Sequence, residues 1–140
     1  MKKLFLILVT LAAMGASQIY AADPHSEKPV ASSEQKFKNV GPAQFDQLRQ
    51  KGTNVVLDVR TEREYKLGHI PGSVLIDFNS PDFDTQLKKL DKSKTYLVHC
   101  ASGGRSAQAC TKMESLNFTN VYNLEGGIRA WKKEGKPVEK

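Results

Sequence analysis

Short apolar runs alternate with amphipathic segments along the chain from Phe37 onward. Three runs, at 55–59, 74–76 and 95–99, are largely apolar, and a fourth, shorter run occupies 120–122. Runs of this length and composition are typical of parallel strands that are buried on both faces. The pattern therefore predicts four strands at these positions.

The segments between these runs predict helices. Pro42 follows Gly41 at a position that is favoured for the first turn of a helix. Further along, Phe83, Leu87 and Leu90 recur at helical spacing. The expected helices are 42–51, 62–67, 81–90, 105–116 and 128–133. Strands that alternate with helices predict an α/β fold, in which a parallel sheet is covered by helices on both faces.

The first 22 residues follow an order of basic, apolar and small side chains. Two lysines precede the apolar run 4–14, and small residues follow it as far as Ala22. This order is typical of a secretory signal, and the run is shorter than the roughly 20 residues that a membrane-spanning helix needs. We expect 1–22 to be a cleavable signal peptide, with a cut after Ala16 or Ser17 as the alternative.

Cleavage would leave a polar leader and one domain. Residues 23–36 carry two prolines and no periodic apolar pattern, which predicts a flexible leader before a single domain at 37–140. The signal predicts a periplasmic location in a Gram-negative cell, and secretion in a Gram-positive one. It also predicts no stable membrane association of the mature protein.

Composition narrows the range of functions. The 140 residues suit one domain, and removal of the two signal lysines lowers the net charge from +6 to +4. This charge suits small anionic ligands, but without a basic–aromatic cluster it does not support nucleic-acid binding. Two cysteines are too few for a disulfide framework or a four-cysteine metal site.

One of the two cysteines stands where a ligand is expected. In an open parallel sheet, ligands bind at the carboxyl ends of the strands, and Cys100 follows the predicted strand 95–99. Gly103 and Gly104 allow successive N–H groups to turn toward one centre, and the helix beginning near Arg105 adds its positive end. Both effects favour the nucleophilic thiolate. The alternative is a buried structural cysteine beside a tight turn.

The length of this loop separates two kinds of cysteine chemistry. Cysteine-dependent phosphatases have the pattern His-Cys, five residues and then Arg. The loop with this spacing forms a ring wide enough to bind a phosphate. Here four residues lie between Cys100 and Arg105. The tighter ring suits one sulfur atom better, so a cysteine phosphatase or an arsenate-reductase-like enzyme is the less favoured alternative.

Three separated blocks of the sequence together resemble a known protein family. They are Leu57-Asp58-Val59-Arg60 continuing through Glu64-Tyr65 to 68–73, the loop 100–105, and 122–131 with 135–138. In this order and spacing they are highly specific and span roughly Phe37 to Val138. The chain resembles the rhodanese-like sulfurtransferases, most of all the small secreted bacterial rhodaneses of the phage-shock protein E type. The resemblance implies a single α/β domain with about five parallel strands.

The resemblance also implies a reaction that passes through a persulfide. Cys100 would take the sulfane sulfur of a donor such as thiosulfate and hand it to cyanide or to a thiol acceptor. The persulfide anion would be held by the active loop, which comprises Ala101, Ser102, Gly103, Gly104, Arg105 and Ser106. The resemblance implies neither a metal nor an organic cofactor.

Ala101 departs from the pattern of many thiosulfate-using members, which place a basic residue directly after the cysteine. We therefore expect weaker capture of a dianionic donor, and we assign the remaining loop charge to Arg105. A non-enzymatic persulfide carrier or partner-binding module on the same fold is the alternative function. The sequence leaves the native donor, the acceptor and the oligomeric state open.

Two charged residues flank the end of the predicted strand 55–59. We expect Asp58 and Arg60 to form a structural ion pair that braces the active loop, with placement of charge around the site as the alternative. Glu64 is expected on an exposed helix surface, away from the site.

The remaining candidates are two histidines and the second cysteine. We expect His69 to be a hydrogen-bonded structural residue and His99 to serve packing, because strand alternation turns its side chain away from that of Cys100. Cys110 falls five residues beyond Arg105 on a helix, about 7.5 Å along its axis. This separation favours a buried structural thiol over a resolving cysteine.

Overall fold

The computed structural model describes residues 36–140 of the chain. The predicted signal peptide 1–22 and all but the last residue of the predicted leader 23–36 lie outside the described residues. Within 36–140, no helix is long and apolar enough to cross a membrane.

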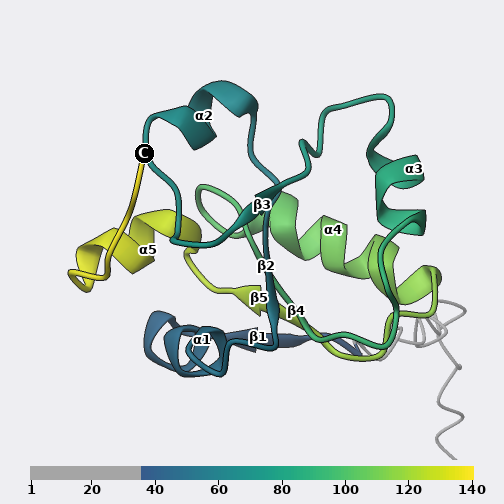
Figure 1. Cartoon of the computed structure of the whole chain (residues 1–140), viewed down its shortest axis with the longest axis horizontal. Coiled ribbons are helices and arrows are strands. Elements are labelled where there is room, and N and C mark those ends of the chain that lie inside the picture. Colours follow the sequence, from purple (N-terminus) through teal and green to yellow (C-terminus); the bar gives the residue numbers. More distant parts are fainter. Residues whose placement is uncertain (1–35) are drawn as a thin grey trace, which may run out of the picture. The chain divides into compact units, whose positions relative to one another are not determined.

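A five-stranded parallel sheet forms the centre of the domain (Figure 1). Its strands are β1 (Lys38–Val40), β2 (Val55–Asp58), β3 (Val74–Leu75), β4 (Tyr96–His99) and β5 (Val121–Leu124). Their order across the sheet is β1-β5-β4-β2-β3. The structure confirms the predicted parallel α/β fold, with β4 at the centre of the sheet between β5 and β2.

The edge strand β1 was not located by the apolar pattern, which predicted four strands. Only Val40 of its three residues is buried, so the strand is too short and too exposed to show a periodic pattern. Its position is fixed by pairing with β5, where Asn39 faces Asn123 and their side chains share a hydrogen bond of 2.8 Å. The strand therefore depends on its neighbour in the sheet rather than on a local signal.

Four helices connect the five strands, and a fifth helix follows β5, in the predicted order. They are α1 (Pro42–Arg49), α2 (Glu62–Lys66), α3 (Phe83–Lys88), α4 (Gly104–Ser115) and α5 (Gly127–Lys133). Helix α3 begins two residues later than expected. Asn117, at φ +68°, follows the end of α4 in the left-handed conformation that often ends a helix.

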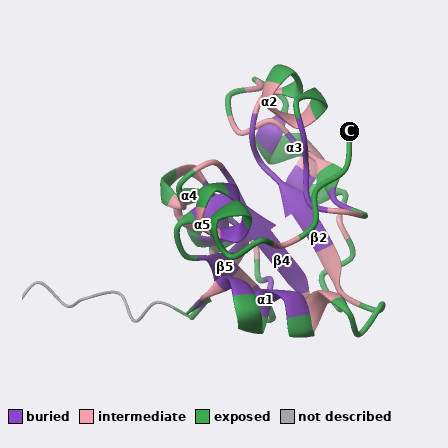
Figure 2. Cartoon of the chain, turned by 90° about the vertical axis from the view of Figure 1, so that its left-hand side faces the viewer, coloured by how far each residue is buried: buried purple, intermediate pink, exposed green. Residues whose placement is uncertain are grey.

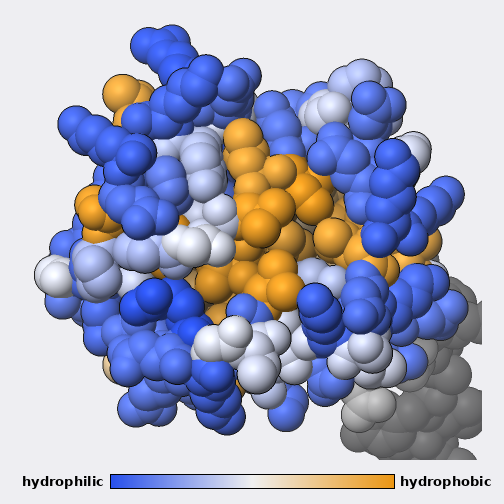
Figure 3. All heavy atoms as spheres, in the orientation of Figure 1, coloured by the Kyte–Doolittle hydropathy of each residue, from blue (hydrophilic) through white to orange (hydrophobic). Residues whose placement is uncertain are grey.

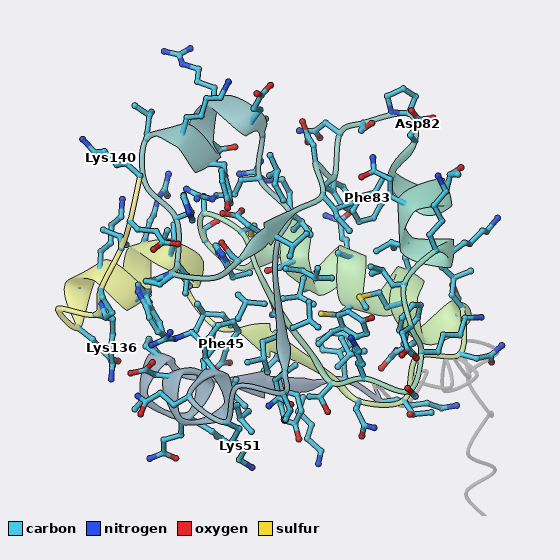
Figure 4. All side chains as sticks on the ribbon, in the orientation of Figure 1. Phe45, Lys51, Asp82, Phe83, Lys136 and Lys140 are labelled. Carbon is cyan, nitrogen blue, oxygen red and sulfur yellow. The ribbon has the colours of Figure 1, made fainter. Side chains whose placement is uncertain are left out.

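Each face of the sheet carries its own apolar core. Helices α3 and α4 pack on one face, through residues such as Phe83 and Met113, and α1 and α5 pack on the other, through Phe45 and Trp131. Figure 4 labels Phe83 and Phe45, and Figure 2 shows that β4 and β5 are mostly buried. Helix α2 has no buried residue. The sheet is thus covered on both faces, as predicted, and α2 is free to contribute polar side chains at the carboxyl end of β2.

Some apolar surface remains on the β3 side of the sheet. The view in Figure 3 shows a central apolar band flanked by polar side chains. Val74 of the short edge strand β3 is 49% exposed. The opposite edge strand, β1, presents two exposed residues and one buried residue.

Candidate active site

The loop that follows β4 is shaped by one left-handed glycine. Cys100 follows β4 directly, and α4 begins only four residues later, at Gly104. Gly103 occupies the N-cap of α4 at φ +104°, a conformation that residues with a side chain rarely adopt. The turn brings the first amides of α4 back toward the cysteine that precedes them.

The Cys100 sulfur accepts hydrogen bonds inside this turn. The Gly103 amide donates to Sγ at 3.1 Å, and the Ser106 hydroxyl lies 3.4 Å from the same atom. The Ser106 hydroxyl also lies 3.1 Å from the Gly103 carbonyl oxygen, so its single proton can be donated to either acceptor. Cys100 itself is only 1% exposed, which places the thiol at the bottom of its loop.

These contacts act on the acidity of the thiol. Burial alone raises the pKa of Cys100, but hydrogen bonds from the Ser106 hydroxyl and from the amides of Ser106, Gly103 and Ser102 together outweigh it. The net effect is a pKa below the usual value for cysteine. Hydrogen bonds to the charged form favour that form, so the loop stabilises the thiolate, the nucleophilic form of cysteine.

The first turn of α5 holds the loop from the other side. The Ile128 amide donates to the Cys100 carbonyl oxygen at 2.9 Å, and the Arg129 amide donates to that of Ala101 at 3.1 Å. A Cβ atom on Gly127 would lie 2.6 Å from the Cys100 oxygen and from the Ala101 carbonyl atoms. The sequence alone does not indicate this contact, because nothing local shows which backbone Gly127 approaches.

The Arg105 guanidinium pairs with the carboxylate of Glu64. Its two terminal nitrogens donate to the two carboxylate oxygens of Glu64 at 2.9 and 2.8 Å. Chiefly because of these hydrogen bonds, the pKa of Glu64 falls to about 2 and that of Arg105 is raised. The expectation that Glu64 lies on an exposed surface away from the site is therefore wrong.

The position of Glu64 has a local cause. Thr61 and Glu64 form a capping box at the start of α2: each side chain bonds the backbone N–H of the other residue. This fixes the Glu64 side chain at the first turn of α2, where it meets the first turn of α4. The spacing of Thr61 and Glu64 in the sequence was the signal for the cap, although not for the pairing with Arg105.

Asp58 and Arg60 form the expected ion pair. Both Asp58 oxygens accept from the Arg60 guanidinium, at 2.9 and 2.6 Å, and the side chains are 0% and 5% exposed. Arg60 also donates to the Gly68 carbonyl oxygen at 2.8 Å, which ties the end of β2 to the segment after α2. The contacts found within 36–140 do not join either side chain to the Cys100 sulfur.

His99 lies on the opposite side of the sheet from the Cys100 thiol. Its ring is fully buried and meets Phe45 edge-on, with the ring centroids 6.4 Å apart. Burial lowers the pKa of His99 to about 4, although Asp58, 3.5 Å away, acts in the raising direction and Arg60 and His69 add to the lowering. His99 is therefore neutral near pH 7, and its contacts are those of a packing residue.

His69 and Cys110 have structural contacts. The His69 ring stacks on Tyr65 at a centroid distance of 3.8 Å, and its Nδ1 lies 3.1 Å from the Tyr65 carbonyl oxygen. Backbone hydrogen bonds in both directions join His69 to Glu139 near the end of the chain. Cys110 is fully buried in the core on the α4 face, where burial raises its thiol pKa. Both cysteines are free thiols.

The arrangement can bind and transfer a sulfur atom. A thiol with a lowered pKa faces amide and hydroxyl donors that would also stabilise an anion attached to that sulfur. In the part of the chain that the structure covers, no group of three or more His, Cys, Asp or Glu side chains is arranged to hold a metal ion.

Comparison with known proteins identifies the family. The family described as "Rhodanese-like domain" matches residues 41–134. Thiosulfate sulfurtransferase GlpE of Ectopseudomonas mendocina is 36% identical over 98 residues, covering 69% of this chain and 86% of that protein. The crystal structure of a rhodanese-related protein from Thermoplasma volcanium has a TM-score of 0.62 and 32% identity, covering 74% of this chain and 98% of that one.

A longer relative shows that the domain also occurs within larger proteins. A tRNA uridine(34) hydroxylase of Cytophaga hutchinsonii is 35% identical over 106 residues, which is 74% of this chain but only 34% of that protein. The chain thus spans about a third of this relative, and most of the length of GlpE. The chain belongs to the rhodanese-like domain family.

The burial of neutral His99 predicts a loss of stability in mild acid. The folded-state pKa of about 4 lies below the usual value for histidine, so the unfolded chain binds more protons between about pH 6.5 and pH 4. The contribution of neutral His99 to the free energy of unfolding is therefore fully present above pH 6.5 and is lost as the pH falls toward 4. The loss amounts to at most about 3 kcal/mol, at about 1.4 kcal/mol per pKa unit. Urea unfolding at a series of pH values measures this loss.

His99→Gln should flatten this pH profile, whatever its effect on stability at pH 7, whereas His69→Gln serves as the matched control and should retain the slope. A His99→Gln profile as steep as that of the unmodified protein would contradict the assignment.

The close approach of Gly127 predicts a large effect of one methyl group. Gly127→Ala places a Cβ atom against the Cys100–Ala101 peptide at φ +58°, so the first turn of α5 must move away from the loop. We expect a loss of at least about 2 kcal/mol, from overpacking and backbone strain together. Gly135→Ala is the control, because Gly135 has a similar φ of +69° but open space around it. Equal losses in the two variants would show that the contact with the loop adds nothing.

Proposed function

We propose that this chain is a sulfurtransferase that carries a sulfane sulfur on Cys100. The observation that carries the proposal is the set of donors on the Cys100 sulfur, since the Gly103 amide and the Ser106 hydroxyl lie where they favour a sulfur anion. The sulfurtransferase relatives that cover most of this chain's length support the same reaction. Thiosulfate serves as the reference donor, and cyanide or a thiol as the acceptor.

The reaction has two transfer steps. In the first, the Cys100 thiolate attacks the outer sulfur of thiosulfate, the S–S bond of the donor breaks, and its electron pair leaves with sulfite. In the second, cyanide attacks the terminal sulfur of the Cys100 persulfide, thiocyanate departs, and the electron pair of the broken S–S bond restores the thiolate. Neither step needs an oxidant, a reductant or a proton from the protein.

The loop supports both steps through its backbone. The donors on Sγ offset the desolvation of the thiolate before transfer, and the amides from Ala101 to Ser106 would hold the terminal sulfur of the persulfide afterwards. The hydrogen bonds from α5 to the carbonyl groups of Cys100 and Ala101 keep these amides in place. Because the donors are preorganised, little rearrangement is needed at the moment of transfer.

The pairing of Arg105 argues against a phosphatase. A phosphatase loop needs a guanidinium that binds the oxygens of the transferred phosphoryl group. Here the Arg105 guanidinium binds both oxygens of Glu64, and the loop has one residue fewer than that ring requires. The low exposure of Cys100 favours a second candidate, a persulfide carrier that shelters its sulfur until a partner thiol approaches.

The N-terminal segment bears on the location of the protein in the cell. We propose 1–22 as a cleavable signal and 37–140 as the domain, which would place the mature protein in the periplasm of a Gram-negative cell. The support is the order of basic, apolar and small residues in the signal. N-terminal sequencing of the protein recovered from a periplasmic extract should begin at Asp23, and an intact Met1 would contradict it.

The persulfide predicts a mass change that depends on one cysteine. After incubation with thiosulfate, the mature protein should gain about 32 Da, the mass of one sulfur atom, and cyanide should remove it as thiocyanate. Cys100→Ser should abolish the gain and the turnover. Cys110→Ala is the matched control and should retain both, because Cys110 is buried in the core. Intact-mass spectrometry and a thiocyanate assay provide the readouts.

The other outcomes select among the candidates. A stable mass gain on Cys100 without turnover would indicate a persulfide carrier instead of an enzyme. Hydrolysis of an aryl phosphate with comparable efficiency would restore the phosphatase. Absence of both mass gain and turnover in the folded protein would overturn the proposal.

A further inference from the structure

The active loop has one cationic side chain, and that side chain is already paired. Between Cys100 and Ser106 the sequence holds Arg105 and no lysine, histidine or second arginine. The Arg105 guanidinium gives both terminal nitrogens to Glu64, in a two-point pair whose side chains are 27% and 32% exposed. Such a bidentate pair fixes both the direction and the charge of the guanidinium.

The charges of Cys100 and Asp77 also act on the Arg105 guanidinium. The pKa of Arg105 is raised chiefly by its hydrogen bonds with Glu64, with smaller contributions from the charges of Cys100 and Asp77. The contact that the structure shows is the two-point pair with Glu64. The single positive charge of the guanidinium is offset before any donor approaches.

We infer that Glu64 sets the donor preference of this site: by holding Arg105, it makes the loop favour sulfur donors that carry a single negative charge over dianionic donors. The inference rests on the proposed sulfurtransferase function and adds the class of donor. A thiosulfonate, RSO₂S⁻, or a persulfide, RSS⁻, fits this class, whereas thiosulfate carries one charge more.

The chemistry of transfer is the same for both kinds of donor. The Cys100 thiolate attacks the outer sulfur of a thiosulfonate, the S–S bond breaks, and its electron pair leaves with the sulfinate RSO₂⁻. With thiosulfate the same electron pair leaves with sulfite, which carries two charges instead of one. The loop amides bind the transferred sulfur in either case. The two donors therefore differ only in the charge of the leaving group, which stays outside the loop.

The size of the effect of Glu64 on donor preference is estimated from the removal of one negative charge beside Arg105. If the Glu64 carboxylate is removed, Arg105 gains a free positive charge within range of the departing group. One additional charge interaction near a protein surface corresponds to about a tenfold change in transfer efficiency, and the change decreases as salt is added. The effect should be larger for the dianion than for the monoanion.

Methanethiosulfonate and thiosulfate form a matched pair of donors. They differ by a methyl group in place of one charged oxygen, so size and the transferred sulfur are held nearly constant. The measured quantity is kcat/KM for each donor with cyanide as acceptor, at low and high salt. The unmodified protein should use methanethiosulfonate more efficiently than thiosulfate.

The informative variant is Glu64→Gln. Glutamine at this position retains the capping box with Thr61, so α2 should stay in place, and thermal unfolding verifies this. We expect kcat/KM for thiosulfate to rise about tenfold at low salt, and kcat/KM for methanethiosulfonate to change less. Arg105→Gln should have the opposite effect on thiosulfate, since it leaves the Glu64 carboxylate uncompensated beside the loop.

Arg129→Gln is the matched control for Arg105→Gln, because both substitutions remove one positive charge. The Arg129 amide bonds the Ala101 carbonyl oxygen, but its side chain is exposed, and the substitution leaves that amide in place. The ratio of the two donors should be the same in Arg129→Gln as in the unmodified protein. A ratio that shifts in this variant and not in Glu64→Gln would transfer the role to Arg129 and overturn the inference.

The remaining outcomes separate this inference from the proposed function. If both donors form the Cys100 persulfide and Glu64→Gln changes their kcat/KM values equally, the donor preference is overturned and the sulfurtransferase stands. If neither donor loads sulfur onto Cys100 in the folded protein, the proposed function fails and the inference fails with it.

Discussion

The site depends on the contact between the first turn of α5 and the peptide that joins Cys100 to Ala101. Two amides of α5 bond the carbonyl groups of these residues, and Gly127 brings the two backbones closer than any side chain would permit. With its carbonyl groups held in this way, the loop can turn its N–H groups toward the sulfur. Helix α5 thus determines the shape of a loop that directly follows β4, although the two are far apart in the sequence.

The thiol is activated by hydrogen bonds rather than by a neighbouring base. His99 precedes Cys100 in sequence, but it lies on the other side of the sheet and is kept neutral by burial. Arg105, the nearest cation in sequence, is bound by Glu64. The contacts that lower the pKa of Cys100 come from the Ser106 hydroxyl and from loop amides, which hold a sulfur anion without adding a charged side chain. If the proposed function holds, such a site would accept sulfur from donors that have little negative charge.

The sequence predicted the elements of the fold well where the signal was local. The apolar runs located β2, β3, β4 and β5, and Pro42 marked the start of α1. Strand β1 was missed because it pairs with β5 through three residues of which two are exposed. The site followed the same rule. Loop spacing pointed to Cys100, but the Glu64–Arg105 pair joins residues 41 positions apart and had no local pattern beyond the capping box.

The central claim is that the loop lowers the pKa of Cys100 by hydrogen bonding, and titration of this thiol tests it most directly. The pH dependence of alkylation in a Cys110→Ala background isolates Cys100, and Ser106→Ala removes the donor that contributes most to the lowering. We expect a pKa below the ordinary cysteine value of about 8.5, and a higher pKa when Ser106 is replaced by Ala. A pKa at or above the ordinary value, unchanged in Ser106→Ala, would contradict the account.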